Sequence, residues 1–174
     1  MRKLEIGSGN NPQPGYEHLE INKDCPNVDY CCDCRSIPVP DNTFDEIAAF
    51  HVIEHMEWLQ AEVAIREWHR VLKPGGILKI ATPNLRYIID AYMDQSDEIW
   101  KRELQIPGWS FPDECHTDKT AWLNFKLFST DIPYNLHKAS FDDRWLGKKL
   151  TDAGFIDITT SSEPTSLNMS GKKK

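Results

Sequence analysis

Leu4-Glu5-Ile6-Gly7-Ser8-Gly9-Asn10-Asn11-Pro12 is the stretch that decides the fold of this 174-residue chain. Its first residues alternate between apolar and polar, which predicts a strand, and two glycines one residue apart predict a tight turn after it. Glycine reaches positive φ without strain and lets a ligand lie against bare backbone. A Gly-x-Gly pair alone is a weak signal, because many ordinary strand-end turns contain one. Its interpretation therefore depends on the residues that follow.

Length, composition and charge indicate a folded chain of one domain. Hydrophobic residues make up 40% of the 174 residues, so we expect residues 1–174 to share a single fold. The formal net charge of −7 argues against a nucleic-acid partner, because phosphates attract Lys and Arg. No apolar run reaches the roughly 18 residues of a membrane span, and no secretory signal opens the chain. We therefore expect a cytoplasmic protein with no membrane span.

Five cysteines are present, and three of them, Cys31, Cys32 and Cys34, are close together. An odd number of cysteines without a secretory signal predicts reduced thiols. Their spacing from Cys25 does not match the paired C-x-x-C of zinc sites, and strand alternation should send Cys31 and Cys32 to opposite faces. We expect no metal site, and we expect the cysteines to pack as small hydrophobic residues.

Strands alternate with helices along the sequence, which predicts an α/β fold with a mainly parallel sheet. The expected strands are residues 2–6, 17–21, 28–32, 44–50, 77–82, 155–160 and 166–170. The expected helices are residues 57–72, 85 to about 104, 119–128, and one that begins at a Ser140 cap and is closed by Gly154. The last two strands follow each other directly, which predicts an antiparallel hairpin at one edge. Residues 172–174 are expected to be a solvated tail.

The first two crossovers are too short for full helices. Ten residues separate Gly9 from Glu20, and Pro12, Pro14 and Gly15 lie among them. A connection between parallel strands normally needs a dozen residues or more. We therefore expect loops or single turns there and thin helical cover over this half of the sheet. Such cover would leave an apolar face that a second copy of the chain could bury as a homodimer.

Three acidic residues lie where ligands bind in parallel sheets, near the carboxyl ends of the strands. Glu5 lies in the first strand, Glu20 near the end of the second, and Asp33 just past the third. A carboxylate after the second strand can accept both hydroxyls of a ribose, and one after the third can accept from an exocyclic amine. Each acid alone could be a solvated loop residue. Their order along the chain predicts a nucleoside pocket.

Several motifs in this order resemble class I S-adenosylmethionine-dependent methyltransferases. The resemblance covers residues 4–84 and 137–156, and it implies a Rossmann-like sheet of the seven-stranded type with reduced helices after the first two strands. The motifs are Leu4-Glu5-Ile6-Gly7-Ser8-Gly9, Asp33 with Ile37-Pro38-Val39-Pro40-Asp41-Asn42-Thr43-Phe44-Asp45, His51-Val52-Ile53-Glu54-His55, Leu72-Lys73-Pro74-Gly75-Gly76-Ile77-Leu78, and Ala153-Gly154-Phe155.

The resemblance assigns roles by position. It implies that Gly7 and Gly9 hold the methionine part of S-adenosylmethionine, that Glu20 binds the ribose, and that Asp33 binds the adenine amine. His51 would lie beside the amino acid part or the methyl group. The expected cofactor-binding residues are thus Glu5, Gly7, Gly9, Glu20, Asp33 and His51.

Residues 105–140 are expected to form an insert or lid on the acceptor side of the pocket. Long connections at the carboxyl ends of strands carry specificity, and His116 and His137 can titrate near neutral pH. We therefore predict His51, His116 and His137 as catalytic residues, whereas His55 could simply help to start the next helix. The aromatic residues of the insert either wall the pocket or only close the core of the insert; they are Trp109, Phe111, Trp122, Phe125 and Phe128.

The function expected from this resemblance is methyl transfer from S-adenosylmethionine to a small-molecule or sugar-like acceptor by direct displacement. The alternative is a non-catalytic S-adenosylmethionine-binding or assembly module, because fold does not fix function. A nicotinamide-dependent oxidoreductase is disfavoured, since Pro12 stands where a third glycine would be and Glu20 comes well before the roughly 20 residues of that fingerprint. The segment after the fourth strand also lacks the Asn/Asp-Pro-Pro-aromatic block of enzymes that methylate base amines.

Overall fold

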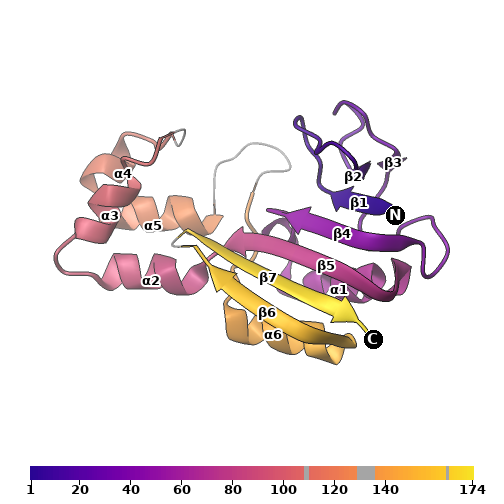
Figure 1. Cartoon of the computed structure of the whole chain (residues 1–174). Helices are drawn as coiled ribbons and strands as arrows, with labels where there is room; N and C mark the ends of the chain where they lie inside the picture. Colours follow the sequence, from indigo (N-terminus) through magenta and orange to yellow (C-terminus); the bar gives the residue numbers. More distant parts are fainter. Residues whose placement is uncertain (108–109, 129–135, 164) are drawn as a thin grey trace.

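A seven-stranded sheet forms the centre of the protein, which is described here from a computed structural model for residues 1–107, 110–128, 136–163 and 165–174 (Figure 1). Its strands are β1 (Lys3–Ile6), β2 (Glu17–Glu20), β3 (Tyr30–Cys31), β4 (Phe44–Phe50), β5 (Leu72–Pro83), β6 (Phe155–Ser162) and β7 (Ser166–Lys173). Their order is β3-β2-β1-β4-β5-β7-β6. Strand β7 is antiparallel to both of its neighbours, β5 and β6, and the other neighbouring strands pair in parallel. The predicted fold class, a mainly parallel sheet with a C-terminal hairpin, is confirmed.

Helices accompany the second half of the sheet. They are η1 (Ile53–His55), α1 (Trp58–Val71), α2 (Leu85–Met93), α3 (Glu98–Glu103), α4 (Glu114–Thr117), α5 (Lys119–Phe128) and α6 (Asp143–Asp152). No helix lies between β1 and β3, where every residue is described, so the expected reduced helices are loops throughout. Among the described residues, no helix is long and apolar enough to cross a membrane.

The main core lies between the sheet and two helices. Helix α1 packs on β5, α6 packs on β6 and β7, and the two helices contact each other (Figure 1). Alternate strand residues enter this layer, and Leu4, Ile6 and Ile47 are at most 1% exposed. Each such side chain contributes about 1.5–3 kcal/mol when fully buried. Trp68 of α1 is also buried and donates from Nε1 to the carbonyl of Cys34 at 3.1 Å.

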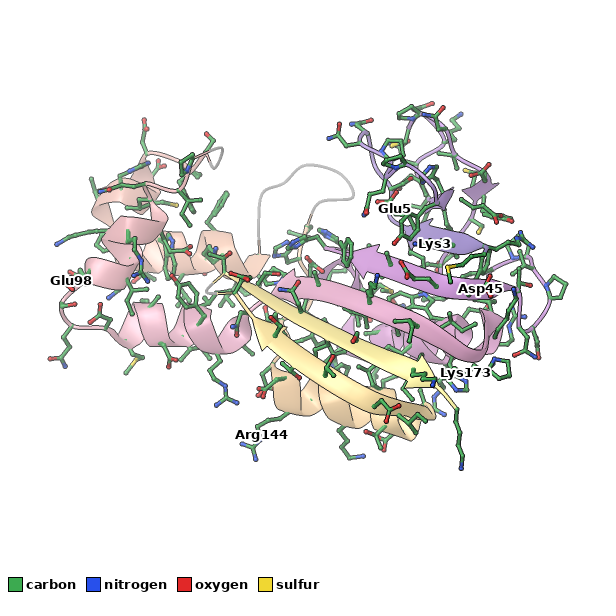
Figure 2. All side chains as sticks on the ribbon, viewed as in Figure 1. Lys3, Glu5, Asp45, Glu98, Arg144 and Lys173 are labelled. Atoms are coloured by element: carbon green, nitrogen blue, oxygen red, sulfur yellow. The ribbon has the colours of Figure 1, made fainter. Side chains whose placement is uncertain are left out.

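The opposite face of the sheet is polar, not apolar as expected. On β1, Lys3 and Glu5 alternate with the core residues (Figure 2). The carboxylate of Glu46 on β4 lies 3.6 Å from Lys3 Nζ and 3.0 Å from Lys79 Nζ. Tyr16 donates a hydrogen bond to Glu46, and burial together with this bond raises the pKa of Tyr16 to about 12. Ion pairs and hydrogen bonds therefore line the face that lacks helices.

The turn Lys73-Pro74-Gly75-Gly76 ends α1, as predicted, but it also lies inside β5. Leu72 pairs with Phe44 and Ile77 pairs with Glu46, so these four residues bulge out of the ladder. Gly75 has φ +80°, a conformation that glycine adopts without strain.

The helix expected over residues 85–104 is two helices. Helix α2 ends at Met93, and α3 begins after Asp97, which has φ 58°. The Asp94 carboxylate accepts hydrogen bonds from the backbone of Ser96 and of Ile99 and so stabilises the break. An Asp at this position favours a turn because its side chain competes for backbone N–H groups.

Helices α2 to α5 enclose a second, separate apolar cluster, at the left of Figure 1. Helix α5 has the predicted bounds, whereas α4 was not predicted. A buried ion pair joins the elements, with Lys126 Nζ 2.9 Å from Glu103 Oε2 and both side chains at most 3% exposed. The buried members of the cluster are Ile88, Ala91, Trp100, Phe111, Cys115 and Trp122.

The C-terminal lysines are not a free tail. Lys172 and Lys173 belong to β7. Lys173 Nζ donates to the carbonyls of His69 and Leu72, both at 2.8 Å, and to Asn42 Oδ1 at 2.9 Å. A cation thus binds the carbonyls at the end of α1, where the helix dipole favours positive charge.

Asp142, not Ser140, caps α6, because its carboxylate accepts from the backbone N–H of Trp145 at 2.8 Å. We expect Asp142→Ala to lower the free energy of unfolding by about 1 kcal/mol, the usual loss for a removed N-cap. Ser140→Ala is the matched control and should change it by less than about 0.5 kcal/mol. Chemical denaturation of both variants measures the difference, and an equal loss in the two would contradict this cap assignment.

Candidate active site

A pocket of about 760 Å³ opens at the carboxyl ends of β1, β2 and β4. The strand order reverses between β1 and β4, and ligands of open α/β sheets bind at such a switch point. The volume lies within the roughly 300–1,000 Å³ of small-molecule sites. Five of the six predicted cofactor-binding residues line the pocket: Gly7, Gly9, Glu20, Asp33 and His51.

The glycine turn after β1 forms one wall of the pocket. Gly7 has φ +70°, its N–H donates to the carbonyl of Leu19 at 2.8 Å, and a Cβ there would lie 2.5 Å from Val52 Cγ2. Gly9 has φ +53°, and a Cβ there would meet nothing within 4 Å. The Ser8 hydroxyl between them is buried without a hydrogen-bond partner among the described residues. The turn thus presents open space at Gly9, whereas Ser8 is not among the residues that line the pocket.

Two carboxylates line the pocket, and both already have partners. Glu20 accepts from the backbone N–H groups of Gly9 and Asn22, each at 3.0 Å, which joins the end of β2 to the glycine turn. Asp33 pairs with Arg35, whose Nε lies 2.9 Å from Oδ1. The hydrogen bonds from Arg35 lower the pKa of Asp33. Each carboxylate keeps acceptor capacity, because an ionised carboxylate offers about four lone-pair sites.

Glu5 is not brought to the pocket. Its carboxylate accepts from the backbone and the side chain of Gln13, at 2.8 and 2.9 Å, and contacts His18 Nδ1 at 3.0 Å. These contacts fix the loop that replaces the first crossover helix. A role of Glu5 in cofactor binding stays a prediction.

A buried carboxylate lies at the end of β4. Glu54 is 1% exposed, and its Oε1 lies 3.1 Å from Nδ1 of His51, a residue with φ +56°. Thr82 donates from Oγ1 to Glu54 Oε2 at 3.3 Å. The hydrogen bond to Glu54 raises the pKa of His51. His51 therefore has one ring nitrogen fixed by Glu54 and the other available to a ligand.

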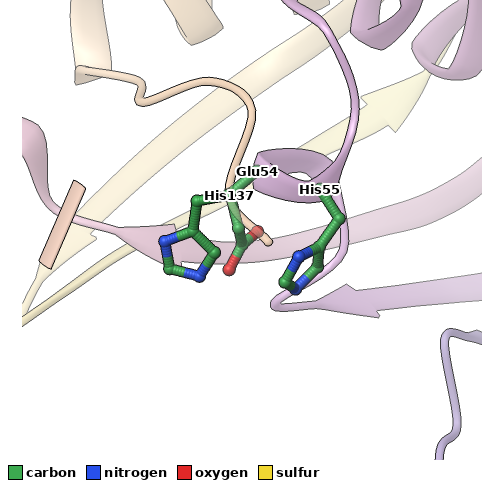
Figure 3. A group of neighbouring side chains, drawn as sticks. All are labelled: Glu54, His55 and His137. Atoms are coloured by element: carbon green, nitrogen blue, oxygen red, sulfur yellow. The ribbon is translucent and has the colours of Figure 1, made fainter. Parts of the chain in front are cut away.

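His137, near the C-terminal end of the insert, lies close to His55 and Glu54. The backbone N–H groups of Lys138 and Ala139 donate to the carbonyl of Glu54 at 2.8 and 3.2 Å. The rings of His137 and His55 lie 5.1 Å apart between centroids, and the Glu54 carboxylate points between them (Figure 3). Burial lowers the pKa of His137, which favours the neutral imidazole at neutral pH.

Not every predicted residue reaches the pocket. His116 lies exposed on α4, outside the pocket lining, so its catalytic role stays a prediction. Among the aromatic residues of the insert, Phe111 and Trp122 are buried in the second cluster, Phe125 packs against it, and Phe128 is exposed. Trp109 lies outside the described residues. The described aromatic residues thus close the core of the insert, and the lid role of residues 105–140 remains a prediction.

Sequence reasoning missed Glu54 as a site residue. The available signal was the position of Glu54 directly after the largely apolar run Phe50-His51-Val52-Ile53. An acid at such a position is buried only if specific partners are present. Arg35 and Lys138 also line the pocket and were not predicted.

Comparison with known proteins supports the predicted relationship. Residues 13–80 match the family model described as methyltransferase domain. A probable S-adenosylmethionine-dependent methyltransferase of Mycolicibacterium smegmatis is 46% identical over 48 residues, which are 28% of this chain and only 18% of that relative. A solved S-adenosylmethionine-dependent methyltransferase of Archaeoglobus fulgidus has a TM-score of 0.63 at 16% identity and covers 99% of this chain and 86% of its own. Residues 13–80 are thus related to S-adenosylmethionine-dependent methyltransferases, and the whole chain has the fold of these enzymes.

The same fold also serves a different reaction. The solved [4+2]-cyclase SpnF matches 99% of this chain and 75% of its own, with a TM-score of 0.57 and 18% identity. At such identity the likeness concerns the fold alone, so function has to be argued from the site.

The contact between His51 and Glu54 makes a prediction about ionisation. The measurement uses protein treated with a chelator, so that no bound metal ion affects the titration. Glu54→Gln should lower the pKa of His51, because an amide removes the charge that stabilises the imidazolium. Titration of the histidine ring signals by NMR measures the change. His69, whose pKa burial lowers at a distant position, is the internal control and should not shift. An unchanged titration of His51 would show that Glu54 does not act on it.

Proposed function

We propose that this protein binds S-adenosylmethionine in the 760 Å³ pocket and transfers its methyl group to a small-molecule or sugar-like acceptor. One observation carries the proposal: a single pocket is lined by the glycine turn, Glu20 and Asp33 and also by His51 and His55, and we assign the first group to a cofactor end and the second to an acceptor end. The first group offers carboxylates and bare backbone and the second offers imidazoles, so the pocket could bind a cofactor and an acceptor side by side.

The residues at the first end fit the cofactor, which supplies a methyl group activated on a sulfonium. Glu20 would accept the ribose hydroxyls, since hydroxyl donors match its remaining lone pairs. Asp33 would accept from the adenine amine beside its contact with Arg35. The open space at Gly9 would face the amino acid part.

The residues at the second end can orient an acceptor and accept its proton. Glu54 fixes Nδ1 of His51, which leaves Nε2 as the nitrogen available to an acceptor hydroxyl, the arrangement of a base and its orienting group. Gln60 and Lys138 add polar groups to the lining. This polar lining supports an acceptor with several hydroxyl or carboxylate groups over a purely apolar one.

The alternative is a module of the same fold that binds S-adenosylmethionine without turnover. Turnover of a panel of sugars and hydroxy acids separates the two, because only the enzyme releases S-adenosylhomocysteine. A homodimer and a cytoplasmic location stay predictions. The sheet face on which a second copy was expected carries the ion pairs of Glu46, so a partner there would have to match charge.

The assigned role of Glu20 can be tested by its removal. We expect Glu20→Ala to weaken S-adenosylhomocysteine binding by about 1–3 kcal/mol, because buried ribose hydroxyls lose their acceptor. Isothermal titration calorimetry measures the loss. Asp24→Ala, an exposed acid in the following loop, is the matched control for the change in charge and should bind normally. Unchanged affinity of the Glu20 variant would remove the ribose role.

A further inference from the structure

Three side chains of metal-binding type converge beside the pocket, which His55 lines and which Glu54 and His137 do not. One ligand atom each from Glu54, His55 and His137 lie within 4.8 Å of one another (Figure 3). Glu54 and His55 come from η1, and His137 comes from the last part of the insert, residues 105–140. In the fold, the segment that closes the insert therefore completes a cluster begun at the end of β4.

The donor set selects a class of ion. Two imidazoles and one carboxylate suit zinc and neighbouring divalent transition metals, whereas magnesium and calcium prefer oxygen donors alone. Zinc–nitrogen bonds of about 2.0–2.1 Å place tetrahedral ligands about 3.3 Å apart. The side chains would thus have to close on the ion by about 1 Å or a little more, a movement within reach of imidazole and carboxylate torsions.

Neighbouring groups hold two of the three ligands in place. His55 Nδ1 contacts the carbonyl of Leu136 at 3.2 Å, which leaves Nε2 as its ligand atom. Thr82 donates to Glu54 Oε2, and the carbonyl of Glu54 accepts from Lys138 and Ala139 next to His137. Such hydrogen bonds orient metal ligands in known sites and fix the tautomer of ligating histidines.

We propose that Glu54, His55 and His137 bind one divalent transition-metal ion of the zinc class. The expectation of no metal site considered only the spacing of the cysteines, so the proposal departs from it. The site itself does not depend on methyl transfer. Because His55 also lines the pocket, the remaining coordination positions would face an oxygen-bearing ligand there, and this last statement rests on the proposed function.

Metal binding to the chelator-treated full chain tests the proposal. We expect calorimetry to show one equivalent of Zn²⁺ per chain, and Co²⁺ to give visible absorption without the near-ultraviolet charge transfer of thiolate ligands. His55→Ala and His137→Ala should each lower the Zn²⁺ affinity at least tenfold. His137→Gln is a second, milder variant, and circular dichroism confirms that each variant is folded.

Two controls make the result decisive. His116→Ala removes an exposed histidine outside the cluster, and Cys32→Ser removes a thiol that lines the pocket; both should leave Zn²⁺ affinity unchanged. No Zn²⁺ binding by the folded wild type, unchanged affinity in folded variants of both histidines, or a thiolate spectrum with Co²⁺ would overturn the proposal. S-adenosylhomocysteine binding by the chelator-treated protein tests the proposed function separately.

Discussion

Glu54 is 1% exposed, and three parts of the chain meet on this residue, two on its carboxylate and one on its backbone carbonyl. An isolated buried carboxylate is costly, so its environment has to supply partners. The residue after β4, His51, and Thr82 of β5 contact the Glu54 carboxylate, and Lys138 and Ala139 at the end of the insert bind the Glu54 backbone carbonyl. Loss of any one part would leave a buried polar group without its partner. The geometry of the acceptor end thus depends on satisfying Glu54, and His51 accepts a strained φ of +56° to do so.

The other half of the sheet solves a different problem, because no helices cover its polar face. Strand residues on this face are largely polar, and the loops that replace the crossover helices need hydrogen bonds to hold them. Glu5 supports the first crossover through Gln13 and His18, while Glu46 gathers two lysines and Tyr16. Hydrogen bonds and ion pairs of carboxylates thus stabilise this face, whereas packed helices stabilise the other. Because loops replace two crossover helices, a chain of 174 residues can form a seven-stranded sheet.

Local patterns predicted what local physics decides. The expected bounds of β4, α1 and α5 lie within one residue of their observed bounds, and the short spacing from Gly9 to Glu20 correctly excluded a full crossover helix. Contacts between distant residues were beyond this reasoning. The approach of His137 to Glu54 is such a contact. The Asp94 turn and the Asp142 cap are local hydrogen bonds of side chains to the backbone, which the spacing of apolar residues does not record. The cofactor end of the site was therefore easier to predict than the acceptor end.

The insert couples its own folding to the acceptor end of the pocket. Its core contains the ion pair of Glu103 and Lys126, and breaking such a pair by removing one partner is costly because it leaves a buried charge. Helix α5 carries Lys126, and the carbonyl of Phe128 at its end accepts from the backbone N–H of His137. From His137 the chain runs directly to the two hydrogen bonds on Glu54. The position of His137 relative to His55 therefore depends on the packing of the insert as well as on the sheet.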